Sequence, residues 1–194
     1  MHSGPAAQDN SSTTPVPKAV KRAVHRFDDC WGLVSEDPKY QKALEYFQRA
    51  YEHQVKGELD EAVELYKKSI ATLPTAEAHT FLGWTYSLLD RLEEAIAECR
   101  RAIEVDPDFG NPYNDIGAYL IEQGLWDEAI PWLEKAARAR RYENYCFPHY
   151  NLGRIYEHQR QWAKAKECYR RSLRHNPDYP LAKASLRRLQ AMLN

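Results

Sequence analysis

The sequence contains few of the residue patterns that carry chemistry. It has 194 residues with eight glycines and four cysteines, and no CxxC, HExxH, GxSxG or phosphate-cradling glycine loop occurs. The cysteines lie far apart, which indicates core or surface thiols rather than a disulfide framework or a metal site; they are Cys30, Cys99, Cys146 and Cys168. These absences predict a protein that is not an enzyme and that holds no cofactor and no metal.

Long apolar runs are also absent. No stretch approaches the roughly 20 apolar residues that a membrane-spanning helix needs, and the N-terminus has no apolar signal core. Hydrophobic residues make up 43% of the chain and charged residues 28%, the balance of an ordinary globular protein. We therefore expect a cytoplasmic protein with no membrane span.

What the sequence does contain is one short phrase repeated at nearly fixed spacing. It occurs at Phe81–Tyr86, Asp115–Leu120 and Asn151–Tyr156, each time with glycine in third place. The glycines are 34 and 36 residues apart, and alanine follows each of them by twelve positions. A period of this size predicts a solenoid of helix pairs in which each pair packs only on its neighbours.

The phrase resembles the pattern of the tetratricopeptide repeat (TPR) family, W-x2-L-G-x2-Y…A-x3-F…P. The second unit matches it at Leu82, Gly83, Tyr86, Ala95, Ala102 and Pro107. The fourth unit matches it at Leu152, Gly153, Tyr156, Ala165, Tyr169 and Pro177. The resemblance covers roughly three quarters of the chain. It implies an all-α, right-handed superhelix of four helix-turn-helix repeats at 43–75, 76–109, 110–143 and 146–179, within residues 38–179.

The segments outside the repeats have their own composition. Residues 1–17 are mostly small and polar and predict a disordered tail. Residues 18–37 predict an amphipathic basic helix and a linker, with Phe27 and Trp31 on its apolar side. Residues 180–194 predict a capping helix whose apolar face carries Leu181, Ala184, Ser185, Leu189 and Met192.

Residues at the helix ends also follow the repeat. Gly57 and Gly124 are expected to end first helices in the left-handed conformation, with Asp90 and Arg160 at the corresponding positions. Asp60 and Asp127 are expected to cap the second helices.

The family resemblance implies that one stripe on the first helices lines a concave groove for a peptide or helix of a partner protein. By register, the groove residues are Phe47, Tyr51, Thr80, Trp84, Asn111, Asn114, Phe147, Tyr150 and Arg154. Clustered aromatic side chains are the usual anchors of recognition surfaces, which predicts an adaptor or scaffold. Two other interpretations stay open: the rings pack as core between neighbouring first helices, or the helix at 18–31 occupies the groove.

One function of the family is excluded by the residues present. TPR co-chaperones that hold the C-terminal carboxylate of heat-shock proteins use a clamp of Lys, Asn, Asn, Lys and Arg on successive first helices. The matching positions of the first three repeats hold Phe47, Tyr51, Phe81, Asn111 and Asp115. None of these is cationic, and the set in the second to fourth repeats is not cationic either.

Charge is distributed unevenly along the chain. Residues 36–137 carry 10 Lys and Arg against 21 Asp and Glu, whereas residues 138–194 carry 13 against 4. The basic end includes Arg138, Arg140, Arg141, Arg170, Arg171, Arg174, Arg187 and Arg188. This asymmetry favours either an acidic or phosphate-rich ligand or head-to-tail self-association, and a solvated surface is the plainer interpretation. No nucleic-acid reading motif is present, so nucleic acid is not the expected partner.

Overall fold

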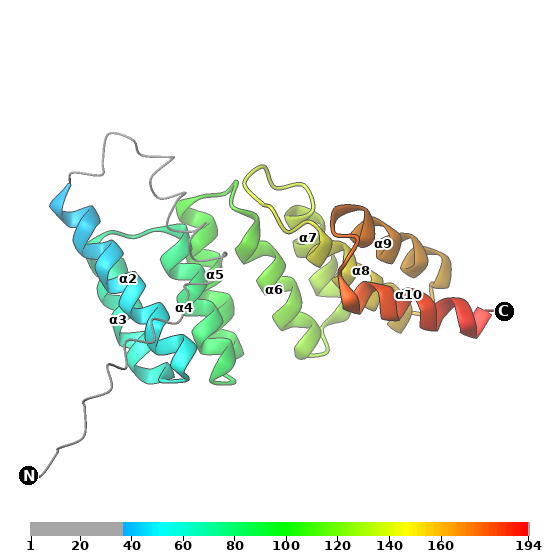
Figure 1. Ribbon diagram of the computed structural model, residues 1–194, viewed down its shortest axis with the longest axis horizontal. Coiled ribbons are helices and arrows are strands. Elements are labelled where there is room, and N and C mark those ends of the chain that lie inside the picture. Colours follow the sequence, from blue (N-terminus) through cyan, green and yellow to red (C-terminus); the bar gives the residue numbers. More distant parts are fainter. Residues whose placement is uncertain (1–36, 194) are drawn as a thin grey trace, which may run out of the picture. The chain divides into compact units, whose positions relative to one another are not determined.

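The computed structural model describes residues 37–193, and the regular elements of this range are helices (Figure 1). They are α2 (Pro38–Lys56), α3 (Leu59–Thr72), α4 (Ala76–Leu88), α5 (Leu92–Val105), α6 (Gly110–Glu122), α7 (Trp126–Ala136), α8 (Cys146–His158), α9 (Trp162–His175) and α10 (Pro180–Leu193). The tail predicted at 1–17 and the basic helix predicted at 18–31 lie outside the described residues.

The helices pair and stack in the order of the chain. α2 packs on α3, α4 on α5, α6 on α7 and α8 on α9, and the second helix of each pair contacts the first helix of the next. Among the first helices, α6 also contacts both α4 and α8, whereas second helices within 37–193 do not pack extensively together. Since helices on the inside of a curved stack are the closer set, the first helices line its inner side. The predicted all-α TPR superhelix is confirmed.

Two glycines show why the repeated phrase needs a residue without a side chain. A Cβ atom on Gly117 of α6 would lie 2.5 Å from Cδ2 of Leu133 in α7, and one on Gly153 of α8 would overlap the ring of Tyr169 in α9. Real Cβ atoms do not come this close to other atoms, because packed interiors have no free volume to absorb them. Glycine at this place in the repeated phrase therefore lets the paired helix approach closely.

Turns between paired helices follow the prediction in conformation but not in capping. Gly57 and Gly124 have φ of 82° and 77°, and Asp90 and Arg160 adopt the same left-handed region at 60° and 58°. The predicted caps are wrong, because α3 and α7 begin one residue before Asp60 and Asp127. These carboxylates instead lie in the first helical turn, where the helix dipole favours negative charge.

The linker from 137 to 145, between α7 and α8, folds back on the preceding repeats. The backbone N–H of Gly110 donates to the carbonyl of Arg141 at 3.0 Å, and Arg141 N–H donates to Asp108 at 2.9 Å. The Arg141 guanidinium lies 4.4 Å from the Phe109 ring centroid and also pairs with Glu77. Arg141 was predicted to belong to the basic patch; it is instead an internal brace between repeats.

The capping helix α10 buries a different stripe from the one predicted. Ala182, Ser185 and Leu189 are buried against α9, whereas Leu181 and Met192 are each 53% exposed. The predicted face is therefore wrong for Leu181, Ala184 and Met192, which are exposed, and Ala182 lies on the packed side instead. Beside this stripe, Arg188 of α10 pairs with Glu157 of α8.

Candidate functional site on the inner side of the stack

The predicted groove residues divide according to burial. Phe47, Thr80 and Asn114, which share one repeat position, are 0%, 4% and 9% exposed. The Phe47 ring packs edge-on to Tyr66 and Phe81, at centroid distances of 5.4 and 5.1 Å. These three side chains lie between neighbouring helices, so the core interpretation applies to them and they cannot meet a partner without rearrangement. The accessible residues of the predicted set, called the inner surface below, are Tyr51, Trp84, Asn111, Phe147, Tyr150 and Arg154.

The N-terminal part of the inner surface is a cluster of rings. Trp84 of α4 is 43% exposed. Phe81, one turn earlier, packs edge-to-face with both Trp84 and Tyr51, each at a centroid distance of 5.9 Å. Edge-to-face contacts of this kind stabilise aromatic pairs beyond their buried area, so the exposed indole is held in place. Phe81 was missed as a site residue, although its place just before the Leu-Gly of the repeat marks it as facing the preceding helix pair.

The middle of the inner surface is polar. Asn151 Nδ2 of α8 donates to Oδ1 of Asn114 in α6 at 3.3 Å, and Asn114 Nδ2 donates to Asp115 at the same distance. Arg154 donates to the Asn151 side chain at 3.4 Å. Asn111 is partly exposed beside this chain of amides. The polar groups thus bond across the repeat boundary and position Arg154 at the surface.

Asp115 is the titratable group of this region that sequence reasoning did not identify. Burial raises the pKa of its carboxyl from the usual 3.8 to about 7, and the hydrogen bond from Asn114 only partly offsets this shift. Its negative charge in turn adds to the burial that raises the pKa of Cys99 and Tyr119. Near neutral pH this carboxyl therefore exists in both protonation states.

The C-terminal part of the inner surface is a second ring cluster. Tyr179, from the linker before α10, packs edge-on to Phe147 and Tyr150 at centroid distances of 5.4 and 5.2 Å. Phe147 is 36% exposed and Tyr150 is partly buried. Tyr150 and Leu186 of α10 both pack against the buried residues Tyr169 and Leu189. Sequence reasoning missed Tyr179 because it lies outside the first helices, where the groove pattern was sought.

The arginines predicted as a basic patch are for the most part paired. Arg138 pairs with Glu134, Arg171 and Arg174 both pair with Glu167, and Arg188 pairs with Glu157. Arg141 is internal, as described above. Arg140, Arg170 and Arg187 form no ion pair with the residues that the structure describes. The eight arginines therefore do not act as one free cationic face.

The part of the chain that the structure describes contains neither a cluster of metal ligands nor a membrane-spanning helix. Among residues 37–193, His, Cys, Asp and Glu side chains nowhere gather in a set of three or more that could hold a metal ion. In the same range each helix is too short or too polar to cross a bilayer.

Stacked helix pairs with an accessible aromatic and polar inner side define a class of repeat proteins that present a surface rather than a catalytic pocket. Two tetratricopeptide repeat family models match the chain, one over residues 76–109 and the other over 108–178. The chain belongs to the tetratricopeptide repeat family.

Comparison with curated proteins finds relatives that are longer than this chain. The type IV pilus assembly protein PilF of Pseudomonas aeruginosa is 30% identical over 146 residues, which cover 75% of this chain and 56% of the relative. A probable UDP-N-acetylglucosamine–peptide N-acetylglucosaminyltransferase, SPINDLY, of Hordeum vulgare is 31% identical over 121 residues, 58% of this chain and 13% of the relative. The chain thus spans little more than half of the first relative and a small part of the second.

Solved structures of TPR proteins share the fold. A structure from a functional characterization of Pseudomonas aeruginosa PilF has a TM-score of 0.74 at 24% identity, covering 79% of this chain and 70% of that one. PilW, described as a widely conserved type IV pilus biogenesis factor, has a TM-score of 0.70 at 22% identity, with 77% and 69% covered. At these identities the likeness concerns the architecture alone.

Proposed function

We propose that the protein is a non-enzymatic adaptor or scaffold that binds a peptide or helix of a partner protein on the inner surface. The observation that carries the proposal is Trp84, a large apolar ring that is 43% exposed yet held edge-to-face by Phe81. A rigid, exposed tryptophan loses little conformational entropy when a partner covers it, and tryptophan is enriched among binding hot spots.

The surroundings of Trp84 support the same function. Tyr51 extends the apolar area on one side, and Asn111 and Arg154 offer donors and acceptors to a peptide backbone or carboxylate on the other. A solved TPR structure with a TM-score of 0.61 and 21% identity, YrrB, is described as having an unusual peptide-binding site. That description, applied to this chain by analogy of fold, favours a peptide ligand.

The test begins with affinity capture on the intact protein and the Trp84→Ala variant, read by mass spectrometry. Val105→Ala is the matched control, because Val105 is 46% exposed but ends a second helix. A partner of the inner surface is captured by the native protein and by the control but not by Trp84→Ala. Cross-linking should then place the bound segment beside α2, α4 and α6.

Direct titration with the captured partner measures the dissociation constant, which decides the question. Removing a hot-spot tryptophan costs about 2 kcal/mol or more, which weakens binding roughly 30-fold. An affinity that is unchanged in Trp84→Ala, while the partner still binds the native chain, would remove the inner surface from the proposal.

Three other expectations stay predictions. They are the cytoplasmic location, head-to-tail self-association, and binding of acidic or phosphate-rich ligands at the basic end. Self-association predicts a sedimentation coefficient that rises with protein concentration and falls with added salt, because salt screens contacts between opposite charges.

A further inference from the structure

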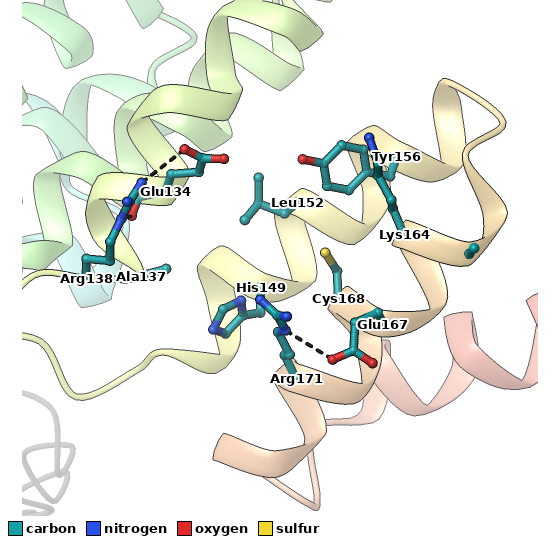
Figure 2. Close-up of a pocket in the computed structure, with 11 residues that line it drawn as sticks. Glu134, Ala137, Arg138, His149, Leu152, Tyr156, Lys164, Glu167, Cys168 and Arg171 are labelled. Carbon is teal, nitrogen blue, oxygen red and sulfur yellow. Dashed lines mark hydrogen bonds and ion pairs between the residues drawn. The ribbon is translucent and has the colours of Figure 1, made fainter.

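A second hollow lies away from the inner surface, where the second helices α7 and α9 flank α8 (Figure 2). Its volume is about 780 Å³. Leu152 and Tyr156 of α8 form its floor, with Ala137 at one side. The charged side chains at its rim are Glu134 and Arg138 from the α7 side and Lys164, Glu167 and Arg171 from α9. This hollow is called the outer cleft below.

The corresponding hollow two helix pairs earlier shows why the outer cleft is open. Between α3, α4 and α5 the volume is about 370 Å³, and His79 lies 2.7 Å from Glu98, which ties α4 to α5. Both of these side chains are only 8% exposed. The same positions 70 residues later hold His149 and Cys168. A cysteine is too short to replace Glu98, and His149 stacks instead on His175, at a centroid distance of 5.3 Å.

The helix lengths widen the cleft further. α7 has 11 residues, whereas α3, α5 and α9 each have 14. The chain leaves α7 at Ala136, and the linker from 137 to 145 runs toward Phe109 and Glu77 rather than along α9. The last helical turn that α3, α5 and α9 possess is therefore missing from α7.

The rim of the outer cleft carries a surplus of positive charge. Its carboxylates are already paired: Glu134 accepts from Arg138 at 3.0 Å, and Glu167 accepts from Arg171 and Arg174, each at 3.1 Å. The two arginines hold the pKa of Glu167 below its usual range. Lys164 has no carboxylate partner in the described part of the chain and lies 5.3 Å from the Tyr156 ring centroid. The cleft thus offers cations around an apolar floor.

We propose that the outer cleft binds a short acidic peptide segment of a partner, with one large apolar side chain inserted between α7 and α9. The apolar side chain covers Leu152 and Tyr156, and acidic residues on either side of it meet Lys164, Arg171 and Arg138. A simple polyanion fits less well, because it leaves the apolar floor in contact with water. This site is independent of the proposed function of the inner surface.

The probe is the pentapeptide acetyl-Glu-Glu-Trp-Glu-Glu-amide, added to the full chain labelled with ¹⁵N and followed by two-dimensional NMR. Shift changes should saturate and concentrate on the lining residues of α7, α8 and α9. Replacing the peptide's tryptophan by alanine, or its glutamates by lysines, should weaken binding at least tenfold. NMR detects even millimolar affinity, so the absence of shifts in the cleft up to about 2 mM peptide overturns the proposal.

Variants of the protein distinguish binding in the outer cleft from general electrostatic attraction. Lys164→Glu with Arg171→Glu should weaken binding at least tenfold, and Arg170→Glu with Arg187→Glu, which changes net charge equally outside the cleft, should weaken it less than threefold. Ala163→Trp fills the cleft without changing charge and should also abolish binding. Equal losses in the two charge-reversed variants, unchanged binding by Ala163→Trp, or equally tight binding of inorganic pyrophosphate to the same residues would each contradict the apolar anchor.

Discussion

Arg141 and Glu77, 64 positions apart in the sequence, are joined by a hydrogen bond from Nη2 to Oε1 at 2.9 Å. The Asp106 carboxylate lies at the same distance from Nε of the same guanidinium. The Arg141 side chain is 24% exposed and that of Glu77 is 13% exposed, so the pair is largely shielded from water. One residue of the third repeat's linker therefore ties together the first helix and the closing turn of the second repeat.

Arg141→Ala should lower the free energy of unfolding by about 2 kcal/mol, because Glu77 and Asp106 then remain as partly buried, unpaired carboxylates. Urea unfolding followed by circular dichroism measures the change. Arg140→Ala is the control and should stay within about 0.5 kcal/mol of the native protein. If Glu77→Gln and Arg141→Ala prove strictly additive, the bond between them contributes nothing to stability.

Gly117→Ala tests the close approach of α6 and α7. The added methyl group collides with Leu133, and overpacking of this kind costs about 1–3 kcal/mol, against a gain of about 1 kcal/mol from the better helix propensity of alanine. In a Leu133→Ala background the collision is gone, so the same change should be neutral or stabilising. Unfolding curves of the four proteins give the coupling energy, and a destabilisation that persists without Leu133 would rule out this contact as the cause.

Asp115→Asn should alter how stability depends on pH. The native pKa of about 7 is higher than the 3.8 of an unfolded chain, so the folded state binds the proton more tightly. The stability that this proton contributes is complete below the unfolded pKa and is lost as pH rises through 7. At pH 8 the variant should therefore be more stable than the native protein by up to about 4 kcal/mol. The difference should vanish below about pH 4. Thermal melts at a series of pH values test this, and a difference independent of pH would contradict it.

Arg160→Gly should stabilise the turn between α8 and α9. Arg160 has φ of 58°, a conformation in which a side chain strains the backbone and glycine does not. The expected gain is about 0.5–1 kcal/mol, and Gly124→Ala at the corresponding turn should lose about as much. Calorimetric melting temperatures report both changes. A lower melting temperature for Arg160→Gly would mean that its side chain makes a stabilising contact.

The repeat and the fold could be predicted because the physics that sets them is local and recurs. Gly83, Gly117 and Gly153 each face a paired helix. In every pair, a residue with left-handed backbone conformation lies in the turn between the two helices. The capping of α3 and α7 could not be predicted as well, because an aspartate one residue inside a helix start looks the same in sequence as one that precedes it.

The helix face that carries the candidate site could be predicted, but only with an error of about one residue position around the helix. Phe47 and Tyr51 lie on the same stripe, yet Phe47 is enclosed by Phe81 and Tyr66 while Tyr51 reaches the surface. That difference depends on how neighbouring first helices approach each other, which a single sequence does not encode locally. Tyr179 and Arg141 act from linkers, where the repeat gives no register.

The shortened α7 also sets where the stack is mechanically weakest. α8 meets α7 less extensively than α4 meets α3 or α6 meets α5. In a linear array each boundary between repeats contributes its own share of cooperativity. The boundary between α7 and α8 should therefore open most readily, and amide hydrogens that depend on it should exchange fastest. The segment from α8 to α10 would then open as a separate foldon while the three preceding helix pairs stay closed.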